Sequence, residues 1–224
     1  MGDCVPPISL RSKMNAKAII FDLDGVICHT DQYHFQAWKQ LADKLGIPFD
    51  EQDNDRLRGV GRMESLNIIL GKSDCRYSTQ EKQAMAEEKN ETYKKLLMQM
   101  TPADLPKETL ATLHELRSRG MLLAIGSSSK NTKLILSRLG LADIFDVVAD
   151  GTEISHSKPN PEVFLLAAER LNINSAEAIV VEDAEAGIDA AKAGGFYAIG
   201  IGAARESLAA DSSIVEIPEI LNIL

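Results

Sequence analysis

Short apolar runs alternate with amphipathic segments along most of this chain. The run at residues 18–21 is followed by a glycine turn and predicts a fully buried strand of a parallel sheet. Beyond residue 102 a regular alternation predicts further strands at 121–126, 145–149, 178–181, 196–201 and 214–217. The segments between them predict helices at 106–119, 130–139, 160–171 and 184–193. Strands and helices in this order indicate right-handed βαβ units.

A helical block interrupts this alternation directly after the first strand. Apolar residues recur there at helical spacing, and Ser78 and Glu81 have the spacing of a capping box. The block predicts helices at 33–47, 63–70 and 78–100. We therefore expect an α/β fold in which a Rossmann-like parallel sheet core carries an inserted all-helical cap domain. The core would be formed by residues 1–31 and 102–224, and the cap by residues 32–101.

Composition and charge exclude several classes of protein. The chain has 224 residues, of which 45% are hydrophobic, and its formal net charge is −9. An acidic chain without a basic run is not expected to bind nucleic acid or an anionic membrane. Cys4, Cys28 and Cys75 form no CxxC pair, which favours free thiols in a reducing compartment. With neither a signal-peptide pattern nor a membrane-spanning run, we expect a cytoplasmic protein.

Polar residues follow four of the expected strands at their carboxyl ends. In an open α/β sheet, ligands bind outside this edge, so the fold would gather residues that are distant in sequence. This convergence points to a functional site more strongly than any one motif does. The clusters are Asp22 with Asp24, residues 127–131, Lys158, and Glu182 with Asp183.

The carboxylates at this edge predict phosphoryl chemistry with a metal ion. Asp22, Asp24, Glu182 and Asp183 would repel one another unless a cation lay among them, and Mg²⁺ prefers such hard oxygen ligands. An aspartate can form an aspartyl-phosphate, and a second aspartate two residues later can act as general acid and base. The alternative is structural: the aspartates end strands and cap turns, and Asp183 is the N-cap of the following helix.

The other two clusters suit an anion. The serines of residues 127–131 and their backbone N–H groups lie at a strand-to-helix junction, which is a common anion site. Lys158, between Ser157 and Pro159, could neutralise charge during phosphoryl transfer. Taken singly, the serines could equally form a helix cap. The lysine could equally be a solvated charge on the surface.

Together these motifs resemble the haloacid-dehalogenase superfamily of phosphotransferases. FDLDG, the serine after the second core strand, the lysine in SKPNP and VEDAEAG occur in the family's order, and the resemblance runs from Lys17 onward. Three further stretches resemble the β-phosphoglucomutase branch of the superfamily. They are TxxYHFxAWKxLA at residues 30–42, GVxRxxSL at 59–66 and KNxxY at 89–93.

The resemblance implies a role for each core residue. Asp22 would take the phosphoryl group, and Asp24 would be the general acid and base. Ser127 and Lys158 would bind the transferring phosphoryl group. The implied Mg²⁺ ligands are Asp22, Asp24 through its carbonyl, Glu182 and Asp183.

The resemblance also implies roles for residues of the cap and for core residues that face the cap. Thr30, His34 and Lys89 would couple cap closure to the activation of Asp24. By residue type alone, His34 could equally be an interfacial histidine, and Arg62 and Lys89 solvated charges. The implied substrate-binding residues are Gly59, Arg62, Lys89, Asn90, Ser129, Lys130 and Asn131, with Arg62 and the last three holding the non-transferring phosphate.

The implied activity is a mutase. It would interconvert β-D-glucose 1-phosphate and glucose 6-phosphate through β-glucose 1,6-bisphosphate, as a monomer with a phosphorylated sugar as partner. A sugar phosphatase on the same scaffold, a dehalogenase and a non-catalytic binding module are the alternatives. His29, Gly61 and Ala184 depart from the family pattern, which usually has an acidic residue and two serines there.

Overall fold

The computed structural model describes residues 16–57 and 60–224, so Gly59 lies outside the described residues. In these segments one sheet of six parallel strands is flanked by helices, and four further helices lie beyond its carboxyl edge. The strands are β1 (Ala18–Phe21), β2 (Leu122–Gly126), β3 (Val147–Ala149), β4 (Ala178–Glu182), β5 (Tyr197–Gly200) and β6 (Ser212–Ser213). The α-helices are α2 (Asp31–Lys44), α3 (Glu51–Asp55), α4 (Arg62–Leu70), α5 (Thr79–Leu97), α6 (Lys107–Ser118), α7 (Thr132–Leu139), α8 (Glu162–Arg170), α9 (Glu185–Ala193) and α10 (Ile220–Ile223).

The strand order is β3-β2-β1-β4-β5-β6, which is the doubly wound order of the Rossmann fold. Ala18 of β1 is in register with Leu122 of β2 on one side and with Ala178 of β4 on the other. The order therefore reverses between β1 and β4. Ligands of such sheets bind in the crevice at this reversal, next to the carboxyl ends of the two strands.

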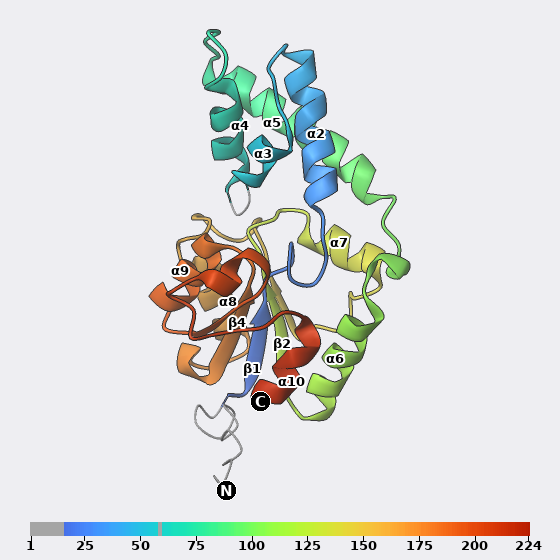
Figure 1. Ribbon diagram of the computed structural model, residues 1–224, viewed down its shortest axis with the longest axis vertical. Coiled ribbons are helices and arrows are strands. Elements are labelled where there is room, and N and C mark those ends of the chain that lie inside the picture. Colours follow the sequence, from blue (N-terminus) through green and yellow to red (C-terminus); the bar gives the residue numbers. More distant parts are fainter. Residues whose placement is uncertain (1–15, 58–59) are drawn as a thin grey trace, which may run out of the picture.

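Helices cover both faces of the sheet, so the central strands are buried on both sides. Side chains alternate between the faces along a strand. Ile19 and Phe21 pack in a cluster with α6, α7 and α10, whereas Ala18 and Ile20 pack in a second cluster with α8 and α9 (Figure 1). This two-sided burial explains why β1 is a continuous apolar run rather than an alternating one.

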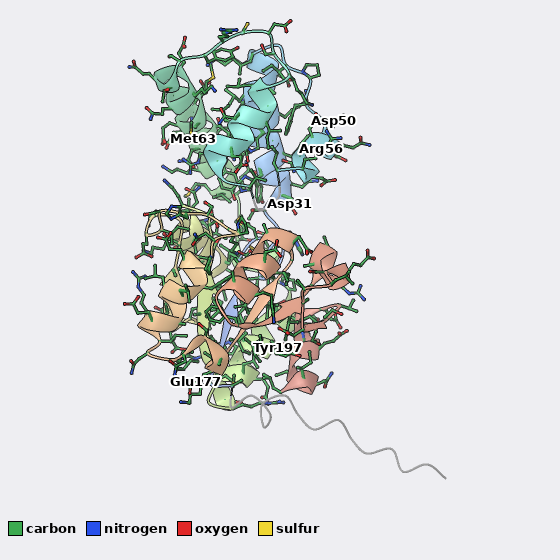
Figure 2. All side chains as sticks on the ribbon, turned by 90° about the vertical axis from the view of Figure 1, so that its left-hand side faces the viewer. Asp31, Asp50, Arg56, Met63, Glu177 and Tyr197 are labelled. Carbon is green, nitrogen blue, oxygen red and sulfur yellow. The ribbon has the colours of Figure 1, made fainter. Side chains whose placement is uncertain are left out.

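The four helices α2 to α5 form a separate cap with its own core. Trp38, Leu66 and Ile69 belong to a hydrophobic cluster distinct from the two that flank the sheet. Asp31 lies at the junction of cap and core, far from Glu177 at the opposite end of the core (Figure 2). The expected α/β fold with a helical cap is therefore confirmed, while the exact domain boundaries stay a prediction. Among the described helices, none is long and apolar enough to cross a membrane.

Three local predictions differ from the structure. The five-residue helix α3 was not expected, because it is too short to show a periodic pattern. The strand expected at 214–217 is wrong: β6 ends at Ser213, and Pro218, which has no N–H for a sheet, lies in a 3₁₀ turn. Helix α8 begins at Glu162, two residues after the start of the helix expected at 160–171, and its N-cap is Pro161.

The capping box at the start of α5 is confirmed and provides a test of cap stability. The backbone N–H of Glu81 donates to Ser78 Oγ (3.3 Å), and that of Ser78 donates to Glu81 Oε2 (2.7 Å). Ser78→Ala should lower the free energy of unfolding by about 1 kcal/mol in urea titrations, because it leaves the Glu81 N–H without its acceptor. Thr79→Ala, one residue further on, is the control, and an equal loss in both variants would contradict this role.

Candidate active site

A cavity of about 1210 Å³ lies between the cap and the carboxyl edge of the sheet. Its walls come from both parts of the molecule. All of the expected site residues within the described segments line it except Thr30, which donates a hydrogen bond to Asp24. They are Asp22, Asp24, His34, Arg62, Lys89, Asn90, Ser127, Ser129, Lys130, Asn131, Lys158, Glu182 and Asp183.

Lys158 joins the two strands that flank the crevice. Its ammonium group donates to Asp22 Oδ1, directly after β1, and to Glu182 Oε1 at the end of β4. Only 7% of Lys158 is exposed, so the alternative of a solvated surface lysine is wrong. The other oxygen of Glu182 accepts from the backbone N–H of Ala184 at 2.9 Å. Glu182 is thus held by two contacts, and Lys158 joins it to Asp22, the nucleophile candidate.

The buried groups at this centre shift one another's pKa values. Burial raises the pKa of Asp22 well above its usual value, and Glu182 and Asp183 raise it further, while Lys158 lowers it. Burial alone would lower the pKa of Lys158, but Asp22 and Glu182 raise it above its ordinary value. Lys158 thus contacts two carboxylates, and Asp183 lies near enough to influence Asp22; hard carboxylate oxygens of this kind are the ligands that a divalent cation prefers.

The residues present fit a magnesium ion. Gly25 (φ +88°) brings the FDLDG turn so close to Asp183 that an added Cβ would lie 2.0 Å from Asp183 Oδ2. Asp183 does not cap α9, whose N-cap is Ala184. Within residues 16–57 and 60–224 no three acidic, histidine or cysteine side chains are already arranged around one metal position. Mg²⁺ needs only one or two carboxylates, since waters and phosphate oxygens complete its shell.

Asp24 is linked to the cap by a chain of hydroxyl groups. Thr30 Oγ1 donates to Asp24 Oδ1, and Tyr93 of α5 donates to Thr30 Oγ1 at 3.0 Å. Burial raises the pKa of Asp24 to about 6, although the Thr30 hydrogen bond partly offsets this. A carboxyl group that titrates near neutral pH can both give and take a proton. Tyr93 was part of the KNxxY motif, but its side-chain contact could not be read from spacing.

His34 and Lys89 meet on the cap side of the cavity. Lys89 Nζ lies 2.9 Å from His34 Nδ1, and 4.5 and 4.6 Å from the ring centroids of Trp38 and Tyr93. Burial lowers the pKa of Lys89 to about 7 and that of His34 well below its usual value. Lys89 is 4% exposed, so it is not a solvated helix charge.

A second group of anion-binding candidates spans the two walls. Arg62 is the first residue of α4, and a quarter of its side chain is exposed. Opposite it, the backbone N–H of Asn131 donates to Ser129 Oγ at 3.2 Å. Asn131 uses its side-chain amide to donate to Asn90 of α5 at 3.0 Å instead of capping α7. This hydrogen bond joins the core loop to the cap.

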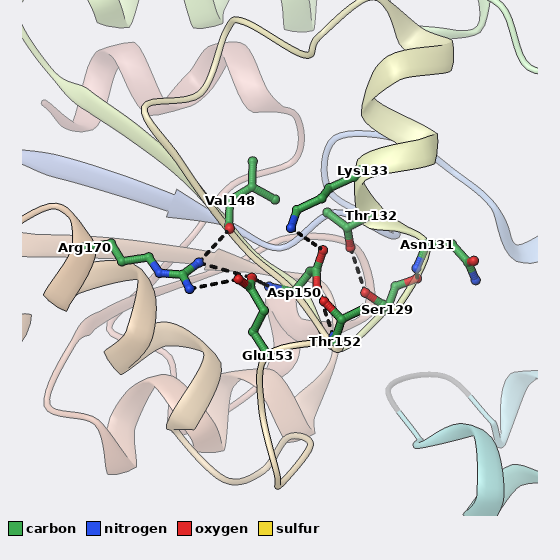
Figure 3. A network of polar contacts seen from close by, with 9 residues as sticks. All are labelled: Ser129, Asn131, Thr132, Lys133, Val148, Asp150, Thr152, Glu153 and Arg170. Carbon is green, nitrogen blue, oxygen red and sulfur yellow. Dashed lines mark hydrogen bonds and ion pairs between the residues drawn. The ribbon is translucent and has the colours of Figure 1, made fainter.

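A polar network beside the cavity fixes the loops that carry these residues (Figure 3). Asp150, which is 1% exposed and follows β3, accepts from the backbone N–H of Thr152 at 2.9 Å and lies 3.8 Å from Lys133 Nζ. The neighbouring Gly151 N–H donates to the carbonyl of Ser129 at 3.1 Å. The loop leading to Lys158 is thereby tied to the Ser-rich loop. Asp150 directly follows the strand expected at 145–149, so its position at the carboxyl edge of the sheet was already indicated by the sequence.

A comparison with protein families identifies the family of this chain. A family model for haloacid dehalogenase-like hydrolases matches residues 16–195. The chain belongs to this family. Its sequence motifs and its strand order agree with that assignment, and the family is one of phosphotransferases and phosphatases.

Two curated proteins and one solved structure are similar to this chain over most of its length. The chain is 43% identical over 197 residues to a β-phosphoglucomutase of Bacillus subtilis, with 87% of each chain covered. It is 32% identical to a phosphorylated carbohydrates phosphatase of Thermotoga maritima, over 82% of this chain and 83% of that one. The solved structure of a β-phosphoglucomutase from Clostridium difficile is 39% identical, with a TM-score of 0.85 and coverage of 92% and 93%.

The raised pKa of Asp24 predicts a pH-dependent stability. Between about pH 4 and pH 6 the folded protein holds a proton on Asp24 that the unfolded chain has released, so this group's contribution to stability falls as the pH rises. In magnesium-free buffer, Asp24→Asn should therefore be more stable than the parent protein at pH 8, by up to about 2 kcal/mol after allowing for partial solvation.

Urea titrations at pH 4 and pH 8 would measure this gain, which should be near zero at pH 4. Asp43→Asn serves as the control, because this exposed residue of α2 lies away from the cavity. A gain for Asp24→Asn that is the same at both pH values would contradict the assignment.

Proposed function

We propose that this chain is a magnesium-dependent mutase that interconverts β-D-glucose 1-phosphate and glucose 6-phosphate. The observation that carries the proposal is the presence of cationic and amide groups on both walls of one cavity. Lys158 lies beside Asp22 in the core, while Arg62 faces the cavity from the cap. An enzyme that binds a bisphosphate in two orientations needs a phosphate site at each end. The 43% identity to a β-phosphoglucomutase supports the same substrate.

The proposed reaction proceeds in two transfers. The 6-hydroxyl of β-glucose 1-phosphate attacks the phosphoryl group on Asp22, and Asp24 takes the hydroxyl proton, which gives β-glucose 1,6-bisphosphate and free Asp22. After the bisphosphate has turned over, Asp22 attacks the phosphorus at C1. The C1–O oxygen leaves with the proton held by Asp24, which releases glucose 6-phosphate and restores the phosphorylated enzyme.

Neighbouring groups would hold charge during both transfers. Ser127 and Lys158 would bind the oxygens of the transferring phosphoryl group, and Lys158 already contacts Asp22. A magnesium ion held by Asp22, the Asp24 carbonyl, Glu182 and Asp183 would neutralise phosphoryl charge. Positioning and charge stabilisation supply most of the rate in such reactions.

The cap would keep water away from the aspartyl-phosphate. Arg62, Ser129, Lys130 and Asn131 would hold the non-transferring phosphate across the cavity. Tyr93 and Thr30 would couple the position of α5 to Asp24 through the chain of hydroxyl groups. Closure of a cap can exclude water and complete a catalytic site in one step. We further expect the protein to act as a monomer in the cytoplasm.

A sugar phosphatase is the second candidate function. The 32% identity to a phosphorylated carbohydrates phosphatase favours it, since the core chemistry would be the same with water as the acceptor. The cap groups weigh against it, because His34, Lys89 and Arg62 are not needed for hydrolysis. The product therefore distinguishes the two functions.

Phosphorus NMR provides the direct test of the proposal. With Mg²⁺ and a trace of β-glucose 1,6-bisphosphate, β-glucose 1-phosphate should be converted to glucose 6-phosphate with little free phosphate. Conversion should stop with excess chelator, and in Asp22→Asn, because that variant has no nucleophile for the aspartyl-phosphate. Free phosphate as the main product would instead establish the phosphatase.

Arg62 should separate isomerisation from hydrolysis. Arg62→Ala removes a guanidinium that can bind phosphate through two parallel hydrogen bonds, so mutase flux should fall at least about tenfold. Hydrolysis of acetyl phosphate should fall much less, because this substrate has no second phosphate. The ratio of hydrolysis to isomerisation should therefore rise.

The matched control is Arg56→Ala, which removes an exposed arginine of the same cap that does not line the cavity. Both rates would be measured on each variant. An unchanged ratio in Arg62→Ala, with unchanged affinity for the bisphosphate, would remove the main reason to prefer a mutase.

A further inference from the structure

An acidic residue lies within the group of residues that would hold the non-transferring phosphate. Glu87 of α5 lines the cavity, and its Oε2 lies 3.8 Å from Arg62 NH1. Its other oxygen, Oε1, lies 3.5 Å from the amide nitrogen of Asn90, one helical turn along α5. No motif in the sequence pointed to Glu87. A carboxylate at a phosphate site is unexpected, because it repels the ligand that the site would bind.

The surroundings of Arg62 explain why a counterion is present. Arg62 is partly buried, and Lys89 and His34 are close enough for Arg62 to lower the pKa of each. Burial also lowers the pKa of Arg62 itself, and Glu87 is the largest influence that opposes this. In the ligand-free protein, Glu87 therefore stabilises a cation that water solvates only in part.

The pair is loose enough to be exchanged. The Glu87 side chain is 61% exposed and the contact distance is long, so the pair contributes at most about 1 kcal/mol. A phosphate dianion binds the guanidinium more strongly than one exposed carboxylate does. Once displaced, Glu87 remains in contact with solvent and close to Asn90, so no charge is left buried.

Resting on the mutase function proposed above, we propose that Glu87 competes with the non-transferring phosphate for Arg62 and keeps that phosphate contact reversible. A bisphosphate that must release one end, turn over and bind again is slowed by a contact that is too strong. Asn90, which Glu87 contacts, also accepts the hydrogen bond from Asn131 of the core loop. Both contacts of Glu87 thus belong to the same proposed phosphate site.

Glu87→Gln tests the inference, because it removes the charge and keeps the shape. Calorimetric titration with glucose 1,6-bisphosphate and Mg²⁺, in the Asp22→Asn background to prevent turnover, should give a Kd about two- to fivefold lower than with Glu87. In the enzyme with Asp22 intact, kcat for isomerisation should fall together with KM, as expected when the bound intermediate becomes too stable.

Glu88→Gln is the matched control. Glu88 follows directly in α5 and carries the same charge, but it pairs with Lys44 at 2.6 Å and does not line the cavity. Its Kd for the bisphosphate should equal that of the parent protein, and an equal gain in both variants would show only a general charge effect and overturn the inference.

The remaining outcomes separate the inference from the function on which it rests. An unchanged or higher Kd in Glu87→Gln would overturn competition at Arg62 and leave the mutase function intact. Tighter binding with an unchanged kcat would overturn the claim that a reversible contact speeds turnover. Failure of the bisphosphate to bind even with Glu87 present would overturn the proposed function and the inference together.

Discussion

The contact of Lys158 with Asp22 and Glu182 is the interaction on which the rest of the site depends. It connects the loop after β3 to the ends of β1 and β4, the two strands between which the sheet order reverses. A buried pair of this kind is costly to break, because the remaining charge is left without a partner. The same lysine holds the proposed nucleophile in place among carboxylates, which are the ligands that Mg²⁺ prefers.

Among the described residues, polar contacts link the cap to this centre, and the cap also packs around a hydrophobic cluster of its own. Tyr93 reaches Asp24 through Thr30, and Asn90 binds Asn131 of the core loop. All of these contacts involve α5 on the cap side. Because α5 also carries Glu87 and Lys89, one helix brings together the proposed acid–base residue and the proposed phosphate site. A change in the position of α5 would therefore affect both.

Those parts of the fold that depend on local sequence could be predicted. The apolar run of β1 and the Ser78 capping box are local patterns, and both were found where expected. The last strand was misplaced, because Ile214 and Ile217 are both buried as a strand would require, yet Ile214 follows the end of β6 and Ile217 lies in a 3₁₀ turn with Pro218. Hydrophobic pattern alone does not distinguish these two ways of burying an apolar residue.

The candidate site was predictable to the extent that sheet topology determines it. Residues after parallel strands meet at one edge, so Asp22 and Glu182 could be placed near each other before their shared contact with Lys158 was known. No comparable rule predicts which side chains of the cap contact one another or contact the core. Whether Arg62 contacts a carboxylate depends on how α4 packs against α5, and Tyr93 reaches Thr30 across 63 residues of chain. The roles assigned to these residues stay predictions.

Two of the departures from the family pattern, Ala184 and Gly61, can be explained from their contacts in the structure. Ala184 has no hydroxyl with which to cap α9, but its backbone N–H still donates to Glu182, so the carboxylate keeps its support. Gly61 is the N-cap of α4, and a Cβ there would lie 3.6 Å from Ser157 Oγ, next to Lys158. A glycine at this position leaves room where the cap meets the lysine loop. Both substitutions thus alter contacts around the reacting groups while leaving Asp22, Asp24, Lys158 and the acidic pair in place.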